Sequence, residues 1–512
     1  MKNNSRTKNS ILNISSSIVY QFINTIVSFI LRTVFIKMLS AEYLGINGLF
    51  TNILSVLSLA ELGIGNAIVY SMYKPLKEND KTKLSALITY YKKLYARIGT
   101  IILILGLSLV PFLKYILNIQ EEIPYITLYY ILFLINTVSS YFMVYKTSIV
   151  TADQKEYVLK KINIIFTLIK LVLQLVSLIA LRSYLLYLII QITLSIMMNY
   201  VMSKKAEKMY SLIKEKQDID ECEKKSIWKN IKAMFTYQVG GVILNNTDNI
   251  IISIIVGTVA VGIYSNYSML VTTISSFTSL IFTSMISSIG NFNLESNNEK
   301  RSFLFKVLEM MFYWIYGFAS VCFIALTQDF INLWIGSEYL LENSTLYIVI
   351  FNFYLTGLLY PIFCFRNTTN LFKSTKYLMI IASIINIVFS IILGKIWGIN
   401  GIFIATALAR LLTNIWYEPY ILFKNYFNRS VYKYYIKNVF ELLLLIIMIC
   451  LNQKICSYVV VDNKILNLAI KLVISLIIPN IIMLIKYYKT KEFKYILEKI
   501  KDKLNINKRI SN

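Results

Sequence analysis

Long apolar runs separated by short polar segments dominate this sequence of 512 residues. A helix rises 1.5 Å per residue, so roughly 20 apolar residues cross the roughly 30 Å hydrocarbon core of a membrane. This criterion predicts about fourteen membrane-spanning helices. Their approximate ranges are 11–36, 44–70, 96–117, 124–149, 162–181, 184–202, 233–256, 260–286, 307–327, 345–365, 377–398, 400–423, 438–453 and 465–486. The pattern therefore predicts an all-α, polytopic membrane protein.

The distribution of basic residues predicts the orientation of these spans. About 40 of the 52 Lys and Arg residues fall in alternate polar segments, and six fall in the segments between them. Because Lys and Arg accumulate in cytoplasmic loops, both termini are expected inside the cell. The first apolar run is too long for a signal peptide and lacks a small-residue cleavage site, so it is expected to be a spanning helix.

Two parts of the sequence are related by an offset of 217 residues. Tyr20-Gln21 recurs as Tyr237-Gln238, and Gly45-Ile46 recurs as Gly262-Ile263. Parallel six-helix repeats characterise one class of secondary transporters, which bind substrate between two lobes. We therefore predict two pseudo-symmetric six-helix lobes followed by two C-terminal helices. The expected boundaries are an N-terminal lobe at 1–202, a cytoplasmic linker at 203–232, a C-terminal lobe at 233–425, and two additional helices with a basic cytoplasmic tail at 426–512.

Composition excludes several classes of function. The chain is 57% hydrophobic and 15% charged, with a net charge of +25. Because its basic residues lie in short loops between apolar runs, we expect membrane lipids as partners and no nucleic acid. The chain has no histidine, and its five cysteines show no metal-binding spacing. We therefore expect no metal site, no cofactor, no catalytic residue and no enzymatic activity.

Two amphipathic stretches lie in predicted cytoplasmic segments. Each is expected to form a helix that lies on an anionic membrane surface, or else docks a partner protein. The apolar face of the first consists of Leu84, Leu87, Ile88 and Tyr91, and that of the second of Phe493, Ile496, Leu497, Ile500 and Leu504.

Charged residues inside predicted spans need a physical explanation, because each costs about 2.5–3.5 kcal/mol to insert. Near the span ends we expect the side chain to extend to the membrane interface, or else to form a structural ion pair. The residues concerned are Arg97, Lys146, Glu309, Glu418 and Lys471. Four charged residues lie deeper, at depths of roughly 13 Å for Glu61 and Lys170 and roughly 20 Å for Asp248 and Arg410.

Two interpretations of these four deeper charges are open. In the first, Glu61 and Lys170 form one ion pair within a lobe, and Asp248 and Arg410 form another. In the second, Lys170 and Arg410 face a cavity and bind the phosphates or acidic sugars of the substrate. Glu61 or Asp248 would then couple transport to H⁺ or Na⁺.

Polar residues on two further spans point to a cavity. Arg32 lies in the first span, which carries no acidic residue. A base there fits an anionic substrate, and it fits equally well an anchor at the outer interface. Near Asp248 the sequence contains Asn245, Asn246 and Asn249. Water in a cavity explains this most polar stretch of any span better than contact with lipid does.

Four segments resemble the polysaccharide flippase family, which includes O-antigen and teichoic-type flippases and belongs to the multidrug, oligosaccharidyl-lipid and polysaccharide exporter superfamily. They are AELGIGNAIVYSMYKPLKEND (60–80), TDNIIISIIVGTVAVGIYSNYSML (247–270), SSIGN (287–291) and GINGIFIATALAR (398–410). The resemblance implies alternating access through a central cavity between two lobes. It also implies transport of undecaprenyl-pyrophosphate-linked oligosaccharide units to the outer leaflet of the bacterial cytoplasmic membrane, with other polysaccharide-assembly proteins as partners. Relatives that flip the peptidoglycan precursor share two extra C-terminal helices.

Two other functions compete with this interpretation. A cation-coupled drug antiporter of the same superfamily would be expected to carry an acid in its first span, which this chain lacks. A glycan polymerase or ligase would need a large external loop, and the longest one predicted here covers 328–344.

Overall fold

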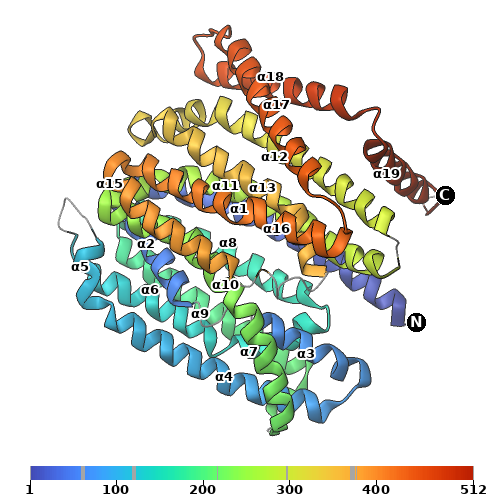
Figure 1. Cartoon of the computed structure of the whole chain (residues 1–512). Coiled ribbons are helices and arrows are strands. Elements are labelled where there is room, and N and C mark those ends of the chain that lie inside the picture. The colour runs from blue at the N-terminus through green and yellow to red at the C-terminus, as the bar shows by residue number, and fades with distance from the viewer. Residues whose placement is uncertain are drawn as a thin grey trace. The chain divides into compact units, whose positions relative to one another are not determined.

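In the computed structural model of the protein, residues 2–58, 64–117, 123–215, 217–295, 298–368, 375 and 377–510 are described. These residues form helices connected by short turns, and no strand occurs among them (Figure 1). The first half of the chain forms α1 (Lys2–Met38), α2 (Ala41–Leu57), α3 (Ile64–Glu78), α4 (Lys81–Ser108), α5 (Leu113–Ile116), α6 (Ile126–Tyr141), α7 (Val144–Ala152), α8 (Glu156–Leu181), α9 (Tyr184–Met209) and α10 (Glu221–Ile255). The second half forms α11 (Thr258–Glu295), α12 (Asn298–Trp334), α13 (Asn343–Thr368), α15 (Leu378–Leu412), α16 (Asn414–Leu422), α17 (Tyr432–Ser457), α18 (Lys464–Tyr487) and α19 (Lys491–Ile510).

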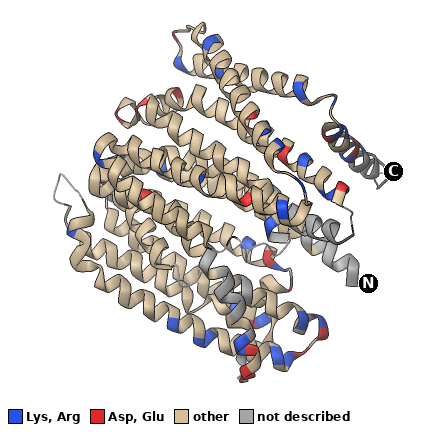
Figure 2. Ribbon diagram, in the orientation of Figure 1, with Lys and Arg blue, Asp and Glu red and all other residues tan. Residues whose placement is uncertain are grey.

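Every predicted membrane span falls on one or two of these helices, which confirms the all-α, polytopic architecture. Within the described ranges, nine helices are long and apolar enough to cross a membrane, and the bent pair α6 and α7 would make a tenth. The predicted spans 233–256 and 260–286 do not pass this test, and 44–70 includes residues 59–63, which lie outside the described part of the chain. They contain Asn, Ser and Thr residues that line a cavity, as described below. Figure 2 shows long stretches of helix coloured as neither basic nor acidic residues, as burial in lipid requires.

The chain divides into two compact units. The first unit contains residues 1–281 and 376–402, and the second contains 282–375 and 403–512. These boundaries pass through α11 and α15 and differ from the predicted ones, so the division into two six-helix lobes stays a prediction.

Two glycines related by the offset of 217 lie at a close, reciprocal contact between α2 and α11 within the first unit. A Cβ atom on Gly45 of α2 would lie 2.1 Å from the carbonyl oxygen of Thr258 in α11. A Cβ atom on Gly262 of α11 would lie 2.3 Å from the carbonyl oxygen of Ala41 in α2. The offset of 217 relates Gly45 to Gly262 and also Ala41 to Thr258. Equivalent residues therefore exchange equivalent contacts, as a local two-fold arrangement requires.

The first amphipathic stretch does not lie on the membrane surface, so this prediction was wrong. It forms the start of α4, which continues without interruption to Ser108. The exposed fractions of Leu84, Leu87, Ile88 and Tyr91 are 3% or less. The apolar face is covered by protein, since α4 packs against α3 and α7 of the same unit.

In the second unit, α12 packs against α13, α17, α18 and α19. The second amphipathic stretch belongs to α19. Phe493 stacks on Trp314 of α12 at a centroid distance of 5.8 Å, while Leu497 remains 40% exposed. Part of the apolar face of α19 therefore contacts α12. The side chains of Ile500 and Leu504 lie outside the described residues.

Four of the five charges near span ends form ion pairs, and whether these side chains also reach the membrane interface stays a prediction. The pairs are Lys146–Glu207 at 2.7 Å, Glu309–Lys437 at 2.5 Å, Glu418–Arg366 at 2.7 Å and Lys471–Asp329 at 2.6 Å. Arg97 is exposed. In each pair, the attraction between opposite charges on neighbouring helices offsets part of the free-energy cost of removing the two charges from water.

Candidate functional site

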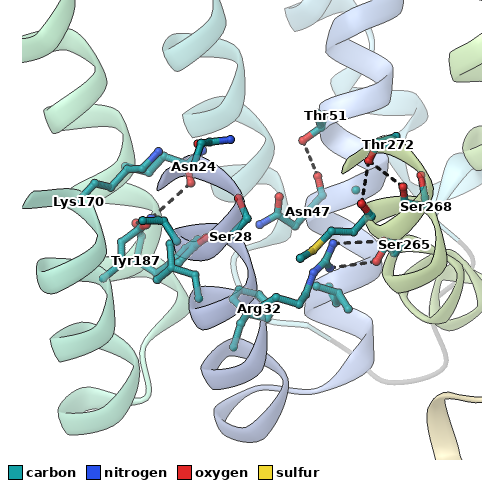
Figure 3. Close-up of a pocket in the computed structure, with 18 of the residues that line it drawn as sticks. Asn24, Ser28, Arg32, Asn47, Thr51, Lys170, Tyr187, Ser265, Ser268 and Thr272 are labelled. Atoms are coloured by element: carbon teal, nitrogen blue, oxygen red, sulfur yellow. Dashed lines mark hydrogen bonds between the residues drawn. The ribbon is translucent and has the colours of Figure 1, made fainter. Parts of the chain in front are cut away.

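A cavity of about 460 Å³ lies in the first unit (Figure 3). Its walls come from α1, α2, α8, α9, α10 and α11. The lining carries amide groups from Asn24, Asn47, Asn52, Gln174, Gln191 and Asn249, and hydroxyl groups from Ser28, Thr51, Thr167, Ser265, Ser268 and Thr272. Such groups can hydrogen-bond water or the hydroxyl groups of a sugar. The helices therefore enclose a polar site within an otherwise apolar bundle.

Arg32 extends into this cavity from α1 (Figure 3). Its Nη1 donates to Ser265 Oγ at 3.0 Å, and its Nη2 donates to the Ser265 carbonyl oxygen at 3.4 Å. The Ser265 hydroxyl itself donates to the carbonyl oxygen of Gly262 at 2.7 Å, which leaves its lone pairs available to Arg32. The guanidinium is thus oriented by neutral oxygen atoms, and no acidic residue in the described part of the chain forms an ion pair with it.

Lys170 lines the same cavity from α8. In the part of the chain that the structure describes, its ammonium group makes no ion pair and no hydrogen bond. Its neighbours are neutral: Gln174, one turn further along α8, donates to the Tyr187 carbonyl oxygen at 3.3 Å and to Gln191 Oε1 at 3.5 Å. Among the described residues, Lys170 is therefore a second cation without a counter-ion.

No Asp or Glu lines the cavity among the described residues. Two cations in a partly enclosed site repel each other and favour an anion between or beside them. A guanidinium binds phosphate oxygens in a planar, forked geometry, and an ammonium adds a compact point charge. The cavity is therefore suited to a phosphate or another anion.

The internal repeat also relates residues on opposite walls of the cavity. The offset of 217 relates Arg32 to Asn249, and Thr51 to Ser268, and all four line the cavity. The side-chain oxygen of Asn249 is buried and makes no hydrogen bond within the described ranges. If the predicted repeat holds, each copy contributes corresponding residues to the described lining, with a cation at Arg32 and an amide at Asn249.

The structure brings together three of the predicted site residues, namely Arg32, Lys170 and Asn249. Asn245 and Asn246 do not line this cavity, and each donates to a carbonyl oxygen one turn earlier in α10. Asp248 does not line it either, and its Oδ1 accepts from Asn386 at 3.4 Å. Glu61 lies outside the described residues.

Arg410 belongs to the second unit and does not line this cavity. Its Nη1 donates to the carbonyl oxygen of Asn352 at 2.9 Å and to the Thr356 hydroxyl, both in α13. The side chain therefore joins α15 to α13. The proposed ion pairs of Lys170 with Glu61 and of Asp248 with Arg410 stay untested.

Sequence reasoning missed most of the neutral lining residues. Asn24, Ser28 and Arg32 recur at intervals of four along α1, and Asn47 and Thr51 do so along α2. Residues four apart share a helix face, so this spacing could have identified the cavity walls. Sequence reasoning considered charged residues and the asparagines near Asp248, and did not search the other spans for this spacing.

The sequence pattern of the family described as Polysaccharide biosynthesis protein matches residues 10–289. None of the curated proteins compared matches the chain. Among solved structures, one described as the lipid II flippase MurJ in an inward closed conformation is similar at a TM-score of 0.65 and 17% identity, covering 92% of this chain and 98% of that one.

Two further solved structures share the fold. An inward-facing multidrug resistance transporter of the MATE family has a TM-score of 0.58 and 13% identity, covering 79% of this chain and 97% of that one. A transporter of the MOP superfamily from Pyrococcus furiosus has a TM-score of 0.53 and 13% identity, covering 80% and 93%. Its description reports a binding pocket of reverse polarity. The chain is a multi-pass membrane protein with a transporter fold, and it belongs to the polysaccharide biosynthesis protein family.

Proposed function

We propose that the protein translocates undecaprenyl-pyrophosphate-linked oligosaccharide units from the cytoplasmic to the outer leaflet of the bacterial cytoplasmic membrane. It would do so by alternating access, with both termini in the cytoplasm, and would supply polysaccharide assembly outside. The observation that carries this proposal is the cavity in which Arg32 and Lys170 lack any acidic partner among the described residues.

The chemistry of the cavity matches the two parts of such a headgroup. Arg32 and Lys170 would bind the pyrophosphate, because charge-assisted hydrogen bonds to phosphate are roughly twice as strong as neutral ones. Asn24, Asn47 and Gln191 would bind sugar hydroxyl groups through amides that both donate and accept. No covalent step is needed, so no residue has a catalytic role.

A drug antiporter is less compatible with this cavity. A cationic drug would need a carboxylate to replace its hydration, and the described lining offers two cations instead. The similar MurJ structure is described as a lipid II flippase, which is a protein for a lipid-linked substrate.

Asp248 is the acid that we propose for coupling to H⁺ or Na⁺. It lies in α10, one residue before Asn249 of the cavity wall, and accepts a hydrogen bond from Asn386 of α15. A change in its charge would alter the contact between these two helices. Glu61 is the second candidate from the sequence.

Transport in proteoliposomes tests the proposal. The substrate is a fluorescent undecaprenyl-pyrophosphate oligosaccharide, and a membrane-impermeant reductant reports its leaflet. The double variant Arg32→Gln, Lys170→Gln should flip the substrate at least about 100-fold more slowly, because hydrogen bonds to charged groups contribute about 1.5–3 kcal/mol each. Flipping at the wild-type rate would show that the cavity cations do not bind the substrate.

Two control variants distinguish a loss of substrate binding in the cavity from a general effect of removing a positive charge from the same helices. Lys37 lies on α1 with Arg32, and Lys161 lies on α8 with Lys170, and both are exposed outside the cavity. The variants Lys37→Gln and Lys161→Gln should flip the substrate normally. Loss of activity in these controls would assign the effect to general surface charge.

A further inference from the structure

A second pocket of about 460 Å³ lies in the first unit, where α4 meets the segment that leads into α10. It shares no residue with the cavity. Four basic residues line it, together with two aromatic ones: Lys93, Arg97, Lys224, Lys225, Tyr90 and Trp228. The distribution of Lys and Arg along the sequence places this end of α4 on the cytoplasmic side.

Two of these cations are already paired. Lys93 Nζ lies 3.2 Å from Asp218 Oδ1, and Lys224 Nζ lies 2.5 Å from Glu221 Oε1, and both acids also line the pocket. Arg97 and Lys225 make no ion pair with any described residue. The lining therefore carries four positive and two negative charges, which leaves an excess of two positive charges for a ligand.

Along one face of α4, basic residues are followed by exposed apolar residues. Lys93, Arg97 and Ile101 are spaced four apart, and Ile104 follows three residues later, so all four share a helix face. Ile101 and Ile104 are 49% and 61% exposed. Arg97 and Ile104 lie roughly 10 Å apart along the axis, at 1.5 Å per residue. A cationic site thus leads directly onto an apolar surface.

The aromatic residues fit the same position at the membrane interface. Trp228 is 49% exposed and lines the pocket together with Tyr90. Trp and Tyr concentrate at the level of lipid headgroups, where an apolar ring and a polar tip are both satisfied. Basic pockets on the cytoplasmic side of membrane helices bind anionic headgroups.

We propose that this pocket binds the phosphate-bearing headgroup of an anionic phospholipid of the cytoplasmic leaflet. Arg97 and Lys225 contact the phosphate, and an acyl chain lies along Ile101 and Ile104. The combination of net positive charge with an adjoining apolar stripe selects a lipid over a soluble phosphate. This inference is independent of the transported substrate, because the two sites share no residue.

Native mass spectrometry of the purified full-length protein tests this assignment. The protein is titrated with phosphatidylglycerol, with phosphatidylcholine of the same acyl chains, and with inorganic phosphate. Phosphatidylglycerol should bind more tightly than either of the others. The variant Arg97→Gln, Lys225→Gln should bind it about 30-fold more weakly, given the contribution of each basic residue at an anionic surface.

Two further variants keep the test decisive. Lys92→Gln removes an exposed charge next to Lys93 on α4 but outside the pocket, and should leave the affinity unchanged. Asp218→Asn releases Lys93 and should tighten phosphatidylglycerol binding, so it tests the site even where the double variant folds poorly. Equal binding of phosphatidylcholine, or full affinity in the double variant, would overturn the proposal. Equal binding of inorganic phosphate would reassign the pocket to a soluble anion.

Discussion

Two sites, one in each unit, treat buried charge in opposite ways. In the first unit, the cavity holds Arg32 and Lys170 without an acidic partner among the described residues. In the second unit, Arg366 and Glu418 form an ion pair at 2.7 Å, with side chains only 6% and 1% exposed. One arrangement satisfies each charge within the protein, whereas the other leaves charge to be satisfied by something else.

A second cluster in the second unit follows the same rule. Glu441 of α17 binds Lys486 of α18, and its Oε1 accepts from the Tyr487 hydroxyl at 2.8 Å. The Tyr313 hydroxyl of α12 donates to the Glu441 carbonyl oxygen. These contacts join α17 and α18 to α12. The difference teaches that paired charges hold helices together, while unpaired cations mark a site for a ligand.

The largest expected effect comes from breaking the buried pair. Arg366→Met would leave Glu418 charged and 1% exposed, and should lower stability by about 3–5 kcal/mol. Thermal unfolding of the purified protein in detergent, followed by tryptophan fluorescence, measures the change. The double variant Arg366→Met, Glu418→Met should recover most of the loss, because it leaves no isolated charge. Equal losses in the single and double variants would contradict a charge-based explanation.

The glycine contact should give the next largest effect. In Gly45→Ala, the new Cβ would meet the Thr258 carbonyl oxygen at 2.1 Å, so α2 and α11 must separate. Overpacking of this kind costs about 1–3 kcal/mol. Gly48→Ala is the matched control on α2, because its Cβ would lie 3.7 Å from the Val261 side chain, an ordinary contact. Similar unfolding midpoints for both variants would show that the helices do not need this close approach.

The variant Lys170→Met tests the cavity cation of the first unit, and here we expect a gain of stability instead of a loss. Removing an uncompensated cation should stabilise the resting protein by about 1 kcal/mol or more, since insertion of a charge is unfavourable. The same variant should lose transport. Lys161→Met, on the exposed face of α8, should change neither property. A Lys170→Met variant that unfolds at a lower temperature would indicate an unrecognised partner for the ammonium group.

The helices were predictable from sequence, but most of the contacts between them were not. Apolar runs locate the spans because a membrane helix must satisfy its backbone internally and present apolar side chains to lipid. The predicted boundary between spans 377–398 and 400–423 also matches a break in α15, where Gly398 adopts a φ of 57°. The sequence pattern of a segment is sufficient to locate a span, because the segment satisfies its own backbone hydrogen bonds and its own contact with lipid.

Ion pairs depend on distant residues, and the sequence did not identify the partner of any charge near a span end. Glu418 lies 52 positions from Arg366, and Glu309 lies 128 positions from Lys437. Each acid looked like an isolated charge near a span end, because nothing local indicates which helix packs beside it. Arg32 and Lys170 were identified from their cost in a membrane, and their shared cavity emerged only when α1 and α8 were placed together.

The smallest effect is expected for the replacement of Lys146. This variant tests whether the role of a charged residue depends on the unit that contains it or on its position within that unit. Lys146 belongs to the first unit, yet it pairs with Glu207 at 2.7 Å, and the two side chains are 22% and 12% exposed. Lys146→Met should destabilise the protein by only about 0.2–1 kcal/mol, because the pair is partly solvated and Lys204 still lies 3.4 Å from Glu207. Transport should persist, since neither residue lines the cavity. A loss as large as that of Arg366→Met would mean that Lys204 does not compensate Glu207. Retained transport would show that a cationic residue takes part in transport because it lines the cavity, and not because it belongs to the first unit.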